Sequence, residues 1–155
     1  MKFIILNVSC LFFFISSYCD KNTPIKNQSK KGSNNTHTKN AQMTIKIGSK
    51  TFEALLYDNA TATAFKALLP LTINMIELND NEKYSDLKGN LPINSFNPKT
   101  IQNGDLMIYG SNTLVLFYKT LSTPYSYTKL GSITDTTGLA EALGSDNILI
   151  SFELN

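Results

Sequence analysis

The stretch Gly104–Thr120 reads GDLMIYGSNTLVLFYKT and decides the fold of this protein. Two apolar runs, Leu106–Tyr109 and Thr113–Tyr118, flank the turn residues Gly110–Asn112, which is the pattern of a β-hairpin. Successive residues of both runs are apolar, so both faces of the hairpin are expected to be covered. The hairpin is therefore predicted to lie centrally in the fold.

Upstream of this hairpin, alternating and helical patterns predict three strands, one helix and a short further strand. We expect strands at residues 44–47 and 51–57, a helix at 60–69 that Pro70 ends, and strands at 71–78 and 84–87. The loop at residues 88–103 is long enough to suggest a function.

Downstream of the hairpin, the sequence predicts a strand at 125–133, a short helix at 138–143 and a final strand at 148–153. We expect Asp135–Thr137 to cap this helix and Gly144 to close it. About seven or eight short strands with turn signals indicate a mainly β fold, a barrel or a sandwich. One helix after the first hairpin and one before the last strand favour a barrel with helices at its ends.

The first 18 residues predict a secretory signal peptide. Lys2 gives a basic start, the run Phe3–Ile15 is almost wholly apolar, and small residues follow at Ser16 and Ser17. The run is too short for a helix that spans a bilayer, which needs about 20 residues.

Cys19 stands where this signal ends, and the junction resembles that of a bacterial lipoprotein, whose cysteine is lipidated. Tyr18 departs from the Gly or Ala that usually precedes such a cysteine. An unpaired cysteine is awkward in an exported protein, which favours lipidation of Cys19 and a membrane-anchored place in the cell envelope. The alternative is ordinary cleavage near Ser17, which leaves a soluble periplasmic or secreted protein.

Residues 19–42 predict a disordered polar tether, because Ile25 and Ala41 are its only aliphatic residues. The tether carries five Lys and one Asp, and residues 43–155 carry eight Lys and eleven Asp or Glu. The formal net charge of +2 therefore hides a mildly acidic domain behind a basic tether. Nucleic-acid binding needs a basic face on the folded part, so we expect none.

Beyond residue 42 the sequence contains no His, Cys, Arg or Trp, and its single histidine, His37, lies in the tether. The domain thus lacks a side chain that ordinarily titrates near neutral pH, a thiolate nucleophile and the commonest zinc ligands. No GxSxG motif and no EF-hand spacing is present. We expect no cofactor and no metal site.

Several stretches, in this order, resemble the bacterial cyclophilin-like domain family over about Met43–Glu153. They are TFEALLYDNATATAFKALLPLTINMIEL (51–78), GDLMIYGSNTLVLFYKT (104–120), YSYTKLGSI (125–133) and GLAEALGSDNILISFE (138–153). The resemblance implies a closed antiparallel cyclophilin-like β-barrel capped by two short helices. The family has no established activity as a class.

True cyclophilins isomerise X–Pro bonds, and their signature is an Arg that bonds the prolyl nitrogen, helped by Phe, Met, Gln and His. This chain has no Arg, and its domain has no His, so the resemblance transfers no catalytic residue. Lysine supplies a charge but not the planar fork of Arg. We expect a non-catalytic binding module; the alternatives are residual isomerase activity, an unrecognised Asp/Lys/Tyr-based hydrolase, and a purely structural envelope module.

Aromatic residues gather in the second half of the domain, and they supply the candidate binding site. Alternation places Tyr118 with Leu114 and Leu116 on one face of its strand and Phe117 with Val115 on the other. Most of these rings are expected in the core, and the remainder are expected to wall an apolar groove for a small molecule, peptide or protein. The candidate ligand-binding residues are Tyr109, Asn112, Tyr118, Tyr125 and Tyr127. Asp80 and Glu82 are interpreted as residues of a polar turn.

Overall fold

The structure, a computed structural model, describes residues 40–155. The predicted signal peptide (1–18), Cys19 and the tether up to residue 39 lie outside the described residues. Within residues 40–155 the elements follow in the order β1 (Ala41–Ile47), β2 (Lys50–Leu56), α1 (Ala60–Lys66), β3 (Leu71–Leu78), β4 (Glu82–Asp86), β5 (Thr100–Ile101), β6 (Asp105–Tyr109), β7 (Thr113–Phe117), β8 (Leu121–Ser122), β9 (Tyr127–Ile133), α2 (Leu139–Leu143) and β10 (Ile148–Leu154).

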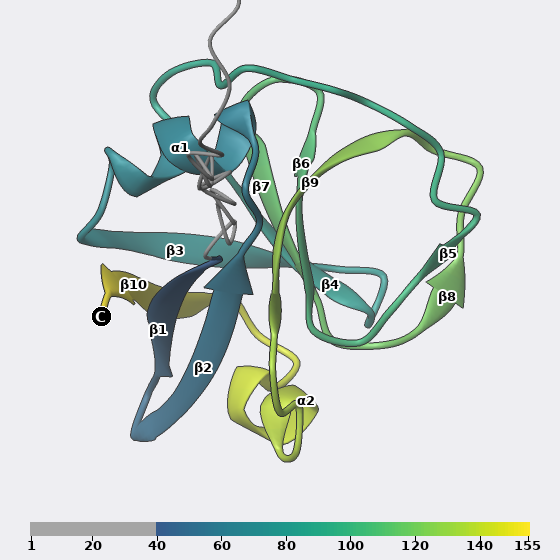
Figure 1. The fold of residues 1–155 in the computed structure, drawn as a ribbon. Helices are drawn as coiled ribbons and strands as arrows, with labels where there is room; N and C mark the ends of the chain where they lie inside the picture. The colour runs from purple at the N-terminus through teal and green to yellow at the C-terminus, as the bar shows by residue number, and fades with distance from the viewer. Residues whose placement is uncertain (1–39) are drawn as a thin grey trace, which may run out of the picture. The chain divides into compact units, whose positions relative to one another are not determined.

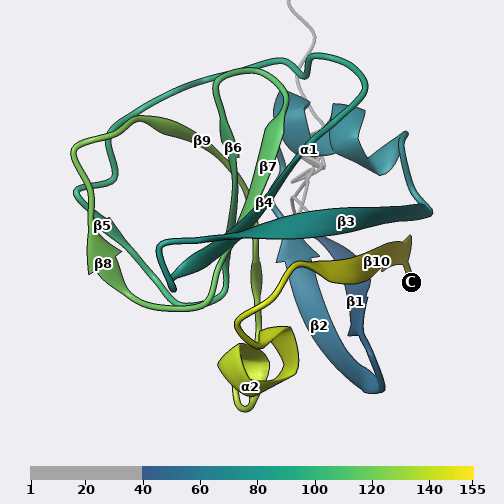
Figure 2. The ribbon, with the colours of Figure 1, turned by 180° about the vertical axis from the view of Figure 1, so that it is seen from behind.

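Eight of these strands close into an antiparallel barrel in the order β1-β10-β3-β4-β7-β6-β9-β2, as Figures 1 and 2 show from opposite sides. The predicted central hairpin forms β6 and β7, between β9 and β4. The strands β5 and β8 form a separate two-stranded sheet beside the barrel. The mainly β barrel class is confirmed.

The two faces of the central hairpin pack into two different apolar clusters. Leu106, Ile108, Leu114 and Leu116 belong to the large cluster that fills the barrel. The outward residues join a second cluster that the small β5–β8 sheet covers; its members are Met107, Val115, Phe117, Tyr127, Ile101, Tyr84 and Leu121. The hairpin is thus covered on both faces, as its unbroken apolar runs predict.

The helices lie at opposite ends of the barrel (Figures 1 and 2). The ring of Phe65 on α1 meets Phe152 of β10 edge to face, with 6.1 Å between centroids. The α1 helix ends at Lys66, not at 69 as predicted, because Leu68 and Leu69 bond to carbonyls three residues back and tighten the last turn. Neither helix of the described part is long and apolar enough to cross a membrane.

The α2 helix buries Leu139 and Leu143 in the barrel cluster. The predicted side-chain cap is wrong: the N-cap is Gly138, and the Asp135 carboxylate accepts instead from the backbone of Thr137 at 2.9 Å. Gly144, with a φ of 57°, closes the helix in the conformation that favours glycine.

Some element bounds differ from those predicted. β1 begins at Ala41, two residues inside the predicted tether, because the backbone there pairs with Leu56 and Leu55 of β2. β9 begins at Tyr127 and not at 125, since the two residues before it belong to the loop after β8. β4 begins at Glu82 and not at 84, where cross-strand pairing with β3 and β7 extends it. This last difference moves Glu82 from a turn onto a strand.

Candidate functional site

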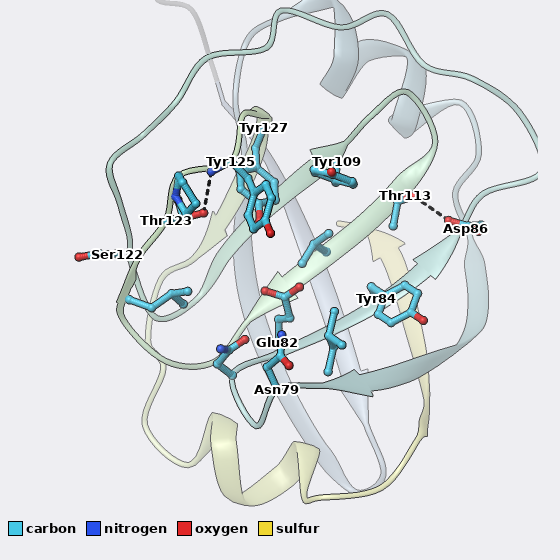
Figure 3. A pocket seen from close by; sticks show the side chains of 15 residues that line it. Asn79, Glu82, Tyr84, Asp86, Tyr109, Thr113, Ser122, Thr123, Tyr125 and Tyr127 are labelled. Carbon is cyan, nitrogen blue, oxygen red and sulfur yellow. Dashed lines mark hydrogen bonds between the residues drawn. The ribbon is translucent and has the colours of Figure 1, made fainter.

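A pocket of about 530 Å³ lies on the outer surface of the barrel (Figure 3). Its floor is the outward face of β4 and β7, and the loop that carries β8 on to β9 forms a wall. The lining residues are Leu78, Asn79, Asn81, Glu82, Tyr84, Asp86, Tyr109, Thr113, Val115, Leu121, Ser122, Thr123, Pro124, Tyr125 and Tyr127.

The twofold period of the strands decides which side chains reach this pocket. On β4, Glu82, Tyr84 and Asp86 line it, while Lys83 between them is fully buried on the other face. On β7, Thr113 and Val115 line it in the same way. A slip of one residue in β4 would place the lysine in the pocket, so the register of this strand sets the charge of the site.

Three tyrosines from three segments stand together at one side of the pocket (Figure 3). The ring of Tyr109, at the end of β6, lies 6.2 Å from that of Tyr125 at an interplanar angle of 85°, and 5.5 Å from that of Tyr127 at 52°. Tyr109 is 46% exposed and Tyr125 is 58% exposed, whereas Tyr127 is 6% exposed. The hydroxyl of Thr123 accepts from the backbone of Tyr125 at 3.1 Å, which fixes the loop that presents this ring.

The structure brings three of the predicted site residues together, Tyr109, Tyr125 and Tyr127, and keeps two apart. Tyr118 is buried in the barrel cluster. It directly follows β7 and continues the inward row of Leu114 and Leu116. Asn112 sits in the β6–β7 turn, where its side-chain amide donates to Leu87 O at 3.4 Å. These two residues therefore do not line the pocket.

Glu82 is one of the pocket residues that the sequence interpretation missed, and it carries the most perturbed carboxyl among them. Figure 3 shows its side chain rising from the floor toward the tyrosines. Burial raises the pKa of Glu82 from 4.5 to about 7, and the negative charge of Glu77 on β3 adds to the shift. The signal in the sequence was the run Glu82-Lys83-Tyr84-Ser85-Asp86. Read as a strand, it places Glu82, Tyr84 and Asp86 on one face.

No cation of the described residues lines this pocket: its ionisable side chains are two carboxyls, Glu82 and Asp86, and the tyrosines. The Asp86 carboxylate accepts from the hydroxyl of Thr113 at 2.6 Å. The buried Oδ1 atom of Asn81, next to Glu82, has no hydrogen-bond partner among the described residues. The site is therefore aromatic and acidic, with an unpartnered acceptor at its edge.

Among residues 40–155, no three His, Cys, Asp or Glu side chains converge as a metal ion would require.

A second hollow, of about 340 Å³, lies near the start of α1 and includes Pro92, Ile93 and Asn94 of the long 88–103 loop. Phe96 of the same loop also lines it, and the ammonium of Lys129 lies 5.5 Å from the centre of that ring. The long loop thus borders this second hollow and contributes nothing to the tyrosine-lined pocket.

Comparison with known proteins agrees with this architecture. The profile of the cyclophilin-like family matches residues 45–153. The chain belongs to the cyclophilin-like family. No curated protein matches the sequence.

Among solved structures, this cyclophilin-like chain is similar to the solution structure of the hypothetical protein AF2241 from Archaeoglobus fulgidus. The TM-score is 0.54 and the sequence identity is 17%, over 78% of this chain and 99% of the archaeal one. This likeness shows a shared fold.

The raised pKa of Glu82 predicts how the cyclophilin-like domain responds to pH. Between about pH 4.5 and pH 7 the unfolded chain has lost this proton and the folded chain keeps it, so the ionisation destabilises the fold as pH rises. Glu82→Gln stays neutral, so we expect it to exceed the native protein in stability by about 1–2 kcal/mol above pH 7 and by little at pH 4.5.

Urea unfolding of both proteins from pH 4.5 to pH 8 measures this difference. Glu141→Gln, on the exposed side of α2, is the matched control and should track the native protein at every pH. An equal stability difference for Glu82→Gln at all pH values would contradict a raised pKa at this site.

Proposed function

We propose that this protein is an exported, lipid-anchored, non-catalytic binding module, whose cyclophilin-like barrel holds a small molecule or a peptide in the tyrosine-lined pocket. One observation carries the proposal: the structure holds Tyr109 and Tyr125 largely exposed beside a hollow of about 530 Å³. Ligand pockets of proteins commonly have volumes of about 300–1,000 Å³ and combine apolar walls with a few polar groups.

Binding rather than catalysis is favoured by the chemistry of the lining. The pocket offers carboxyls and hydroxyls but no histidine, cysteine, lysine or arginine. The whole sequence lacks the arginine on which prolyl isomerisation by true cyclophilins depends. An isomerisation assay with proline peptides and the full chain is expected to give the uncatalysed rate, and an accelerated rate would overturn this part of the proposal.

Ligand binding is tested by nuclear magnetic resonance of the full chain with a collection of small neutral, anionic and cationic fragments. We expect binders to shift signals of Tyr109, Tyr125 and Thr113, and we expect Tyr125→Ala to weaken them at least about tenfold. Phe96→Leu, an exposed ring outside the pocket, is the control and should leave these affinities unchanged. Binders that shift only other surfaces would refute the site.

Export and anchoring rest on the sequence of residues 1–42. A basic start, a short apolar run and Cys19 before a polar tether support lipidation at that cysteine. Labelling cells with a radioactive fatty acid should mark the native protein and not Cys19→Ala. Label that persists in the variant would refute Cys19 as the anchor.

A further inference from the structure

We propose that the tyrosine-lined pocket recognises an alkylammonium cation, which rests against the wall formed by the rings of Tyr109 and Tyr125 and faces the carboxylate of Glu82. The inference deepens the proposed binding function and rests on it. The ligand class is an organic amine or a quaternary ammonium, offered either by a free small molecule or by the lysine side chain of a peptide.

The arrangement of the rings is the first support. Tyr109 contacts Tyr125 edge to face, with 6.2 Å between centroids, and Tyr127 at a tilt, with 5.5 Å between centroids, so the three rings pack together as one wall of the pocket. Rings packed at differing angles present both faces and edges to the pocket beside them, and a ring face attracts a cation through its quadrupole. Contact with exposed aromatic faces is how proteins recognise quaternary ammonium ligands.

The charges of the pocket are the second support. Glu82 rises from the floor toward the tyrosines (Figure 3), and Asp86 lies on the same face of β4. An ionised pair of carboxylates would repel an anionic ligand and attract a cationic one.

The domain's own lysines leave this pocket empty of positive charge. The three lysine–aromatic contacts among the described residues lie elsewhere: Lys83 and Lys119 are 5.6 Å and 5.9 Å from the ring of Tyr118, and Lys129 is 5.5 Å from that of Phe96. The pocket tyrosines, by contrast, face carboxyls without any lysine among the lining residues. A cation bound from outside would make, with the pocket tyrosines, the same kind of cation–π contact that lysines of the chain make with Tyr118 and Phe96.

Binding is expected to depend on pH through Glu82. Without a cation its raised pKa keeps this carboxyl largely protonated below pH 7, so an ammonium must displace that proton to bind the carboxylate. The charge that acts on Glu82 is that of Glu77 on β3, and the Asp80–Lys119 ion pair follows β3 in the turn. The other ionisable groups that line the pocket are Tyr84 and Asp86 of β4, Tyr109 of β6, Tyr125 of the loop before β9 and Tyr127 of β9, whereas β7 presents Thr113 and Val115. Affinity should rise severalfold between pH 6 and pH 8 and then level off.

The test titrates the full chain with two pairs of probes that match in shape and differ in charge. One pair is choline and 3,3-dimethyl-1-butanol, and the other is N-acetyl-lysine amide and N-acetyl-norleucine amide. Magnetic resonance signals of Tyr109, Tyr125 and Thr113 report where each probe binds. We expect at least one cation to bind the pocket about tenfold or more tightly than its neutral partner, and the pair that discriminates identifies a free amine or a peptide lysine as the source.

Variants separate the charge from the rings. Glu82→Gln should remove most of the preference for the cation and its pH dependence, whereas Glu141→Gln should leave both unchanged. Tyr109→Phe keeps the ring and should retain binding, and Tyr109→Leu should weaken it about tenfold. Neutral probes that bind the pocket as tightly as the cations would overturn the cation inference and leave the binding function standing; probes and fragments that all miss the pocket would overturn both.

Discussion

Replacing Gly131 with alanine is expected to destabilise the domain by about 3 kcal/mol and to lower its melting temperature by about 10 °C. Gly131 lies on β9 and pairs with Leu106 of β6 on one side and Leu56 of β2 on the other. A Cβ atom there would lie 2.4 Å from the backbone oxygen of Leu55 and 3.2 Å from the Cα atom of Leu56. Both obstacles are backbone, so one strand must move to admit the methyl group.

The strand movement would disturb the pairing of β2 with β9, which we call the seam of the barrel. β2 and β9 share three residue pairs, and Gly131–Leu56 is one of them. β9 also carries an extra residue, Leu130, opposite Leu106 and Met107, so its backbone already bends at this point. A shift of the seam removes packing and hydrogen bonds together, which is why the expected cost lies at the upper end for a single added methyl group.

Gly89→Ala is the matched control, because a Cβ atom at Gly89 would meet nothing within 4 Å and the residue has an ordinary φ. We expect its stability to equal that of the native protein or to exceed it by up to about 1 kcal/mol, since alanine restricts the unfolded chain. Thermal and urea unfolding measure both variants. Equal stability of the two alanine variants would mean that β9 and β2 do not approach as closely as the structure has them.

Periodicity predicted the barrel well because its central hairpin is apolar on both faces and its other strands alternate. It failed at β5 and β8, two residues each, which are too short for any period and owe their pairing to contacts with Met107, Val115 and Phe117. The same limit hid part of the candidate site. Tyr125 was a candidate from the sequence, but Ser122 at the end of β8 and the next residues, Thr123 and Pro124, which line the pocket beside it, were not.

Alternation along a strand decides the direction of some of the candidate side chains. Tyr109 faces outward because it ends an outward row of β6, and Tyr118 faces inward with Leu114 and Leu116. The prediction of Tyr118 as a pocket residue was wrong because the same alternation turns its side chain into the barrel. Glu82 was missed because its strand has few apolar residues, so the position of β4 depends on a buried lysine that no hydrophobic pattern records.

That lysine, Lys83, makes one compact polar network inside the barrel. Its ammonium donates to the backbone oxygens of Gly144 and Asp146 at 2.8 Å and 2.7 Å and pairs with the carboxylate of Glu77. The hydroxyl of Tyr118 lies 2.9 Å from both oxygens of the same carboxylate. The network joins β3, β4 and the segment after α2, and it fixes the face of β4 that turns Glu82 toward the pocket.

Lys83→Met is therefore expected to destabilise the domain by about 3–5 kcal/mol, the largest loss among the variants considered. The methionine fills most of the volume but leaves Glu77 partly buried without its cation and two carbonyl oxygens without their donor. Urea unfolding at pH 7 measures the loss. The double variant Lys83→Met/Glu77→Gln should lose less than the two single variants together, because the pair is removed as a unit.

The pH dependence of this loss distinguishes a broken ion pair from a mere packing defect. In the native protein, burial opposes ionisation of Glu77, but the hydrogen bonds from Lys83 and Tyr118 and the charge of Lys83 outweigh it and hold its pKa below 4.5. A carboxyl with a lowered pKa stabilises the fold above its unfolded pKa, and that contribution is lost as pH falls through the folded value. In Lys83→Met, Glu77 is still partly buried but has lost its cation, so its pKa rises. The ionised Glu77 then no longer stabilises the folded variant, and the variant has no such stability to lose in acid. The stability difference between native protein and variant should thus shrink steadily from pH 7 toward pH 3.5; a difference that stays constant over this range would show that the lysine acts through its volume and not its charge.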